Sequence, residues 1–429
     1  MRLLLVDPTD LDLVHEAFKA EMADGFHIAL TKVIVDKLYK QGTQLSRSEI
    51  SELLDLIRKD PLHPSLPVGR NARLLDCHIE LNEQDMRRVE RHVDRLEKNA
   101  PKIFEKRATQ MARLVLRDLK KSWPQYSRRE QRDVMQFEKR LRTRWKKPLS
   151  TMRHFLVLSR QLVAGFRTRI DSDPARSMLW EVLTRSHARA IRTSEEIYCL
   201  LASGFADGAL SRWRTLHELA VVSHFLVLHG EDVAVKYFDH HLIATKKRMD
   251  ELATPFWAQV AAQDATFTAE HAKVKSLCDS LLQKHGSSFG TDYGWAADAL
   301  QKSGVPFGTK GPNFRQIEDA VGAGRYRAHY QWASADIYAS PKGTYTREAH
   351  DFPSVHMGPT NMGLDVAGVG TVYLMAEMME DLVSLYPSMD AVFTLKMLNK
   401  LAVDAERDFG RCKKQLEAAQ RAAGPMPRI

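Results

Sequence analysis

The chain has 429 residues, with 63 Lys and Arg against 54 Asp and Glu, and a formal net charge of +9. Hydrophobic residues make up 44% and charged residues 27%, ordinary values for globular proteins that exclude a chain disordered throughout. No apolar run reaches the roughly eighteen residues of a membrane-spanning helix, so we expect no membrane partner. Four scattered cysteines lack C-x-x-C spacing, which is typical of reduced thiols, and a cytoplasmic location is expected.

Apolar residues recur at steps of three and four along most of the chain, and alternating β patterns are scarce. Near the N-terminus such a stripe predicts a first helix, and the capping-box pattern Ser46–Glu49 predicts the start of a second. Three prolines between Asp60 and Pro67 end that helix. A polar helix is expected from Glu83 to Lys98, before Pro101. The sequence therefore predicts an all-α fold.

The excess positive charge is concentrated between Pro101 and Ser150. This basic segment contains sixteen Lys or Arg and five Asp or Glu, which leaves the rest of the chain close to neutral. Two helices are expected in it, on either side of Trp123–Ser127. A dense stripe of cations is typical of proteins that bind phosphate backbones, but also of solvated helices and of surfaces that face acidic proteins or anionic membranes.

Aromatic residues alternate with the cations of the basic segment, as they do in surfaces that stack bases. Trp123, Tyr126 and Trp145 are the candidates, although aromatic side chains at helical spacing are also typical of a core. We expect this segment to bind nucleic acid, with RNA favoured. The candidate phosphate-binding residues are Arg113, Arg117, Lys120, Lys121, Arg128, Arg129, Arg140, Arg144 and, further along the chain, Lys342.

Four parts are expected in the chain. They are a helical N-terminal region (1–100), the basic helical segment (101–150), a larger helical domain (151–420) and a flexible tail (421–429). Two stretches of the domain, 286–324 and 340–370, are rich in Gly or Pro and are expected to be irregular. Its long helices are expected over Phe155–Phe166, Met178–Ala202, Asp207–His229, Asp232–Met249, Val366–Tyr386 and Met389–Ala419.

The helix expected from Asp207 carries a first group of polar residues. Arg214 and Glu218 stand four residues apart, so they face each other as a helical ion pair. Arg212 and His217 have the R-x4-H spacing of helical ribonucleases of the HEPN superfamily. This spacing also arises by chance in a chain with 17 His.

A second polar group lies on a helix expected to end near Tyr338. Arg327, Tyr330, Ser334 and Tyr338 share one face of that helix, where a core stripe would be apolar. Such a face is typical either of a functional site or of a buried hydrogen-bonded network.

We expect no metal site. His217 and His224 lie on the same face, but about 10 Å apart along the helix axis. That is too far for two ligands of one zinc ion. Adjacent residues on a helix point about 100° apart, so Asp239, His240 and His241 do not converge either.

Two separated motifs resemble those of one bacterial family. The stretches Ala209–Glu218 and Tyr326–Gly343 resemble, in this order, domain of unknown function 5677, and the resemblance covers roughly residues 178–381. It implies an all-α, HEPN-like helical bundle engaged in nucleotide or RNA transactions. Relatives place a His where this chain has Tyr338, and a phenol with a pKa near 10 is a poor general base. The family positions carried over are Arg214, Glu218, Arg327, Ser334 and the turn Ser340–Gly343.

The resemblance implies an RNA-directed protein, namely a metal-independent endoribonuclease of bacterial anti-phage defence, abortive infection or a toxin system. In such enzymes His handles the 2′-hydroxyl proton and Arg stabilises the transition-state charge, without a cofactor. A homodimer or a partner antitoxin is expected. The alternative is a catalytically silent nucleic-acid-binding or regulatory module of the same fold; a third hypothesis is a partner of a nucleotidyltransferase, modified at Tyr338. The candidate catalytic residues are Arg212, Arg214, His217, Glu218, Arg327, His329, Ser334 and Tyr338.

Overall fold

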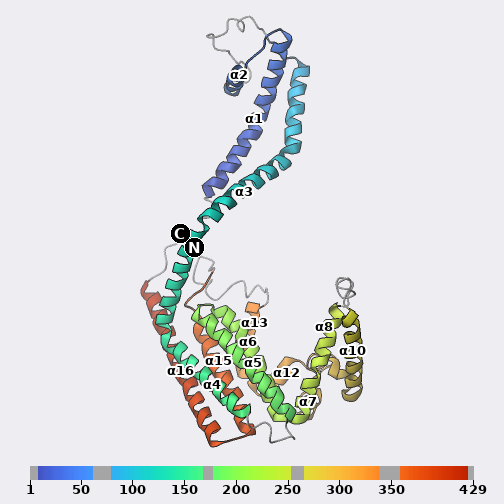
Figure 1. The fold of residues 1–429 in the computed structure, drawn as a ribbon, viewed down its shortest axis with the longest axis vertical. Helices are drawn as coiled ribbons and strands as arrows, with labels where there is room; N and C mark the ends of the chain where they lie inside the picture. The colour runs from blue at the N-terminus through green and yellow to red at the C-terminus, as the bar shows by residue number, and fades with distance from the viewer. Residues whose placement is uncertain (1–7, 61–78, 168–176, 253–264, 338–357, 424–429) are drawn as a thin grey trace. The chain divides into compact units, whose positions relative to one another are not determined.

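The computed structural model describes residues 8–60, 79–167, 177–252, 265–337 and 358–423 (Figure 1). These residues form helices joined by turns and contain no strand, so the all-α prediction is confirmed. The chain divides into two compact units, Met1–Asp133 and Val134–Ile429. Within the described ranges, no helix has the length and apolar character needed to cross a membrane.

The N-terminal unit contains α1 (Pro8–Lys40), α2 (Arg47–Lys59) and the first part of α3 (Glu83–Arg144). The predicted capping box is present, since Ser46 Oγ accepts a hydrogen bond from the Glu49 N–H at 3.3 Å and the Glu49 carboxylate accepts one from the Ser46 N–H at 2.7 Å. The three helices share a small buried apolar core made of Ala29, Leu30, Val33, Ile34, Leu38, Leu53, Ile57 and Val89.

The basic segment lies mostly on α3, a single helix of 62 residues that Figure 1 draws as one continuous coil. The predicted breaks are wrong, because Pro101 and Pro124 both lie inside this helix. A proline removes one N–H donor and disturbs the carbonyl four residues earlier. Most side chains between Pro101 and Gln136 are exposed, so water can satisfy the disturbed carbonyls. The two compact units divide within this segment, after Asp133.

The centre of the C-terminal unit is a bundle in which α6 packs against α5 and α15, and α16 packs against α4 and α15. The helices predicted from apolar stripes are present, and most of their ends lie within a few residues of the predicted ends. Trp145 is 1% exposed and packs on Phe409 with ring centroids 5.9 Å apart; its predicted role in base stacking is therefore wrong. The helices are α4 (Lys146–Arg167), α5 (Ser177–Ala202), α6 (Ala206–His229), α15 (Leu364–Leu385) and α16 (Met389–Ala423).

Two glycines of α15 allow its neighbours to approach closely. A Cβ on Gly370 would lie 2.4 Å from Trp213 Nε1 of α6, and a Cβ on Gly368 would lie 2.4 Å from Phe409 of α16. Such distances are below van der Waals contact, so α15 packs on both helices only because these positions lack a side chain. The position of α6 in the bundle depends on this contact.

Shorter helices flank the bundle, and α12 and α13 pack against α6. The predicted helix Asp232–Met249 is interrupted at His240, and the stretch 286–324, expected to be irregular, contains several short helices. The expected stretch 340–370 is described only from residue 358, and it becomes helical at Leu364. The flanking elements are α7 (Glu231–Asp239), α8 (His241–Leu252), α10 (Ala265–His285), η4 (Ser287–Gly290), η5 (Gly294–Ala296), α11 (Ala297–Lys302), α12 (Phe314–Ala320), η6 (Ala323–Tyr326) and α13 (Arg327–Ile337).

Candidate functional site

The polar faces of α6 and α13 meet, although they lie more than a hundred positions apart in the chain. The Tyr330 hydroxyl donates a hydrogen bond to Glu218 Oε1 at 2.9 Å, and Arg214 Nε donates to the same oxygen at 3.1 Å. The Arg214 guanidinium also lies over the Tyr330 ring, 4.7 Å from its centroid. The predicted ion pair between Arg214 and Glu218 is thus present, and it joins the two motifs.

A second link between the motifs passes through Glu318 of α12, whose side chain is fully buried. His217 Nε2 lies 2.9 Å from Glu318 Oε1, and Arg327 donates to Glu318 Oε2 at 2.7 Å. One carboxylate therefore holds α6, α12 and α13 together. We call the set Arg214, His217, Glu218, Glu318, Arg327 and Tyr330 the polar cluster.

The position of His217 does not fit its predicted role as a general base. Its side chain is fully buried and stacks on Trp213, with ring centroids 5.5 Å apart and planes 10° apart. Nδ1 is buried and has no hydrogen-bond partner among the described residues. Burial lowers the pKa of His217, so the imidazole is neutral at neutral pH and donates through Nε2 to Glu318. Within the described residues, the ring is therefore closed off from solvent.

The R-x4-H spacing does not bring its two residues together. Arg212 pairs with Glu196 of α5 at 2.6 Å, whereas His217 points to Glu318. Five residues along an α-helix turn the side chain by about 140°, so this spacing places the two groups on different faces. Within one chain, Arg212 and His217 therefore do not lie side by side, and their joint catalytic role stays a prediction.

The remaining predicted site residues are dispersed. Ser334 Oγ donates to the Tyr330 carbonyl at 2.7 Å, within its own helix. The His329 ring contacts those of Trp213 and Trp332, with centroids 6.1 and 5.3 Å away. Tyr338, Lys342 and the turn Ser340–Gly343 lie outside the described residues.

The buried, neutral state of His217 makes stability depend on pH. In the unfolded chain a histidine titrates near pH 6.5, whereas burial holds the folded-state pKa of His217 lower. Between these values the unfolded chain binds more protons, so this site lowers the free energy of unfolding as the pH falls below about 6.5. We expect His217→Gln to lose less stability than the wild type between about pH 7.5 and 5.5, measured by urea denaturation.

His224→Gln is the control with the opposite sign. A hydrogen bond of 2.6 Å to Asp381 raises the pKa of His224, so its protonation stabilises the fold at low pH and is lost as the pH rises through the folded-state pKa. Its removal should increase the loss on acidification. Equal losses in the wild type and His217→Gln would contradict a neutral His217.

A cavity of about 730 Å³ opens beside Glu218 of the polar cluster. The residues that line it include Arg185, Arg189 and Tyr293. Burial, followed by the charge of Glu218, raises the pKa of Tyr293 to about 12, so this phenol is a hydrogen-bond donor at neutral pH. His240 also lines the cavity, and its Nε2 atom lies 2.8 Å from the carbonyl oxygen of Thr291. Glu218, Asp292 and His241 line the cavity as well, so it offers proton acceptors beside the donors and cations.

The basic segment presents its charges to solvent. Every one of its sixteen Lys and Arg side chains is exposed. Three of them, Arg117, Arg142 and Lys147, lie within 4 Å of carboxylates, whereas cations such as Lys120 and Lys121 form no ion pair with any described residue. The Trp123 ring, 48% exposed, stacks on Tyr126 with centroids 5.6 Å apart. Of the three predicted aromatic side chains, Trp123 is exposed and Tyr126 half-buried among exposed cations, whereas Trp145 is buried.

Sequence reasoning missed the acids that complete the polar contacts. Besides Glu318, Glu377 of α15 accepts hydrogen bonds from Tyr326 at 2.6 Å and Arg325 at 2.5 Å. A signal for Glu318 was present, because Asn313 and Gln316 form a capping box at the start of α12. That pattern predicts a helix within the stretch that was expected to be irregular. As for metals, no group of three or more His, Cys, Asp or Glu in the described ranges could hold an ion.

These features define an all-α protein with an exposed basic segment and a polar cluster between α6 and α13. Residues 181–350 match a family of unknown function (DUF5677), which confirms the resemblance drawn from the two motifs. No curated protein and no solved structure matches the chain. The HEPN-like relationship stays a prediction.

Proposed function

We propose that this protein binds RNA through the basic segment and that the helical domain acts as a binding or regulatory module. The observation that carries the proposal is the exposure of all sixteen cations between Pro101 and Ser150. Lys and Arg that are not neutralised by carboxylates bind phosphates and release condensed counterions, which supplies most of the affinity of sequence-independent binding.

The aromatic side chains of the segment favour single-stranded RNA. Stacking of bases on exposed aromatic rings is a common way to hold single strands, whose bases are not enclosed in a duplex. Trp123, which stacks on the half-buried Tyr126, supplies such a ring beside Lys120, Lys121 and Arg128.

The polar cluster favours a structural role over catalysis. A metal-independent ribonuclease needs an accessible group that accepts a proton near neutral pH. His217 is enclosed, and burial together with Glu218 raises the pKa of Tyr330 to about 12. An endoribonuclease is the second candidate function, because Arg214, Glu218 and Arg327 are partly exposed and a cavity opens beside Glu218. The HEPN-like, toxin and phage-defence settings belong to this second candidate.

Salt dependence tests the proposed binding. We expect the logarithm of the association constant for a single-stranded RNA, measured by fluorescence anisotropy, to fall with the logarithm of salt concentration with a slope of about −4, as roughly six phosphate contacts require. A flat plot would contradict the proposal.

Incubation of excess protein with RNA in EDTA separates the two functions. We expect no fragments with 2′,3′-cyclic phosphate ends. Cleavage that disappears in Arg327→Ala would instead establish the endoribonuclease.

A further inference from the structure

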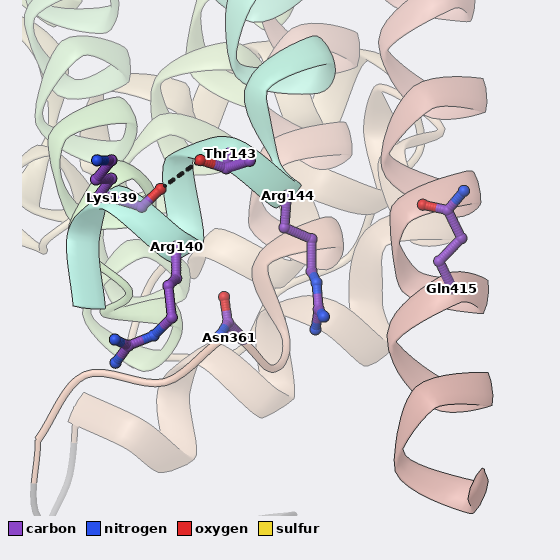
Figure 2. Close-up of a pocket in the computed structure, with 6 residues that line it drawn as sticks. All are labelled: Lys139, Arg140, Thr143, Arg144, Asn361 and Gln415. Carbon is purple, nitrogen blue, oxygen red and sulfur yellow. Dashed lines mark hydrogen bonds between the residues drawn. The ribbon is translucent and has the colours of Figure 1, made fainter. Parts of the chain in front are cut away.

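A cation-lined pocket lies in the C-terminal unit, where the last turns of α3 meet α16 and the segment before α15. Its volume is about 620 Å³. Three of its six lining side chains are cationic, none is acidic, and the others are a hydroxyl and two amides. Figure 2 shows them as Lys139, Arg140, Thr143, Arg144, Asn361 and Gln415.

The three cations have no partner that explains their position. Lys139, Arg140 and Arg144 form no ion pair with any residue in the described ranges, and like charges on neighbouring turns of a helix repel one another. Cations often offset the free carbonyls at the end of a helix, but two of these carbonyls already accept hydrogen bonds here. The Trp145 N–H donates to the Leu141 carbonyl at 2.8 Å, and the Arg144 carbonyl accepts from Cys412 Sγ at 3.3 Å.

Asn361 supplies a second, independent observation. Its Oδ1 is buried and accepts no hydrogen bond from the described residues, and in Figure 2 the amide lies between the side chains of Arg140 and Arg144. A half-turn about χ2 exchanges this oxygen for the Nδ2 donor. A buried amide oxygen without a donor is unfavourable. In the exchanged orientation Nδ2 takes its place, and a bound anion would accept the hydrogen bond that Nδ2 donates.

The backbone fixes this amide in place. The Thr360 N–H donates to the Gly204 carbonyl at 2.8 Å, and the Met362 N–H donates to Thr360 Oγ1 at 3.1 Å. Gly204 has a φ of +83°, and a Cβ there would lie 2.8 Å from the Thr360 carbonyl. The turn between α5 and α6 thus anchors the segment that carries Asn361.

We propose that this pocket binds a phosphoryl anion. Arg140 and Arg144 present planar guanidinium groups that match pairs of phosphate oxygens, and Lys139 adds a third positive charge. The amides of Asn361 and Gln415 provide neutral donors. The anion is either a backbone phosphate of RNA, in which case the inference rests on the proposed function, or the phosphate of a free small molecule.

Calorimetric titration of the full chain with inorganic pyrophosphate, at constant ionic strength, tests the pocket. We expect saturable binding that weakens at least tenfold in the double variant Arg140→Ala/Arg144→Ala and several-fold in Asn361→Leu. Arg192→Ala/Arg248→Ala, which removes two exposed cations outside the pocket, should bind like the wild type. Absence of saturable binding, or equal binding in Arg140→Ala/Arg144→Ala with an unchanged circular dichroism spectrum, would overturn the proposal.

Competition with a labelled single-stranded RNA identifies the source of the phosphate. If pyrophosphate displaces the RNA and the Arg140→Ala/Arg144→Ala variant weakens both ligands, the pocket holds the RNA backbone. If the wild type binds pyrophosphate but not RNA, the pocket takes a small phosphorylated molecule. In that case the RNA-binding proposal is wrong and the pocket proposal stands. If RNA binds but pyrophosphate does not, the pocket proposal fails and the RNA-binding proposal stands.

Discussion

An alanine variant that lacks four cations of the basic segment is expected to bind single-stranded RNA on the order of 10²- to 10³-fold more weakly in about 0.1 M salt. Each phosphate contact to a single strand contributes about 0.7 to the slope of the logarithmic salt plot, so the slope should also fall in magnitude by about 3. All four side chains are exposed, so their removal leaves the core intact. The four are Lys120, Lys121, Arg128 and Arg129.

The matched control removes the same number of charges from the C-terminal unit. It leaves the net charge of the two variants equal, so a general charge effect would weaken both equally. Only the variant in the basic segment should change the affinity and the slope, measured by fluorescence anisotropy. A similar loss in both variants would contradict a dedicated binding surface. The control positions are Lys275, Lys302, Lys310 and Lys396, all exposed.

Glu318→Ala is expected to destabilise the C-terminal unit by roughly 3–5 kcal/mol. The side chain is fully buried and accepts hydrogen bonds from both His217 and Arg327. Removing it leaves a buried N–H donor and a guanidinium without their acceptor, which costs far more than the loss of a surface ion pair. In thermal denaturation this corresponds to a fall in Tm of roughly 6–12 °C.

Glu377→Ala is the control for this effect. Glu377 also accepts hydrogen bonds from two side chains, Tyr326 and Arg325, but its side chain is 34% exposed. Water can replace it, so the expected loss is about 1 kcal/mol or less. If Glu318→Ala cost no more than Glu377→Ala, the polar cluster would not be the link between α6, α12 and α13 that the structure indicates.

The bundle could be predicted from sequence because its helices carry apolar stripes. The predicted helix Met178–Ala202 differs from α5 by one residue, and Asp207–His229 differs from α6 by one residue. A helix that buries one face has apolar residues at steps of three and four along a single segment, so it can be predicted from the local sequence. Glu218 and Tyr330 were each placed on a polar helix face by their spacing, but only the structure shows that these faces meet.

The continuity of α3 and the burial of His217 could not be predicted from local sequence. They depend on solvent and on residues that are distant in the sequence. Pro101 and Pro124 end helices by local rules, but in the exposed α3 water replaces the lost hydrogen bonds. His217 carries a titratable side chain, yet it lies four residues from Trp213 on the buried face of α6. Its partner Glu318 comes from a short helix 101 positions away, and no local pattern in α6 specifies that pairing.

Ultraviolet cross-linking of single-stranded RNA to the full chain, followed by mass spectrometry of the peptides, tests the central claim most directly. The account predicts that the cross-linked peptides fall between Pro101 and Ser150 and include Trp123, which stacks on Tyr126. Cross-links confined to α6, α12 and α13, with none in the basic segment, would contradict it.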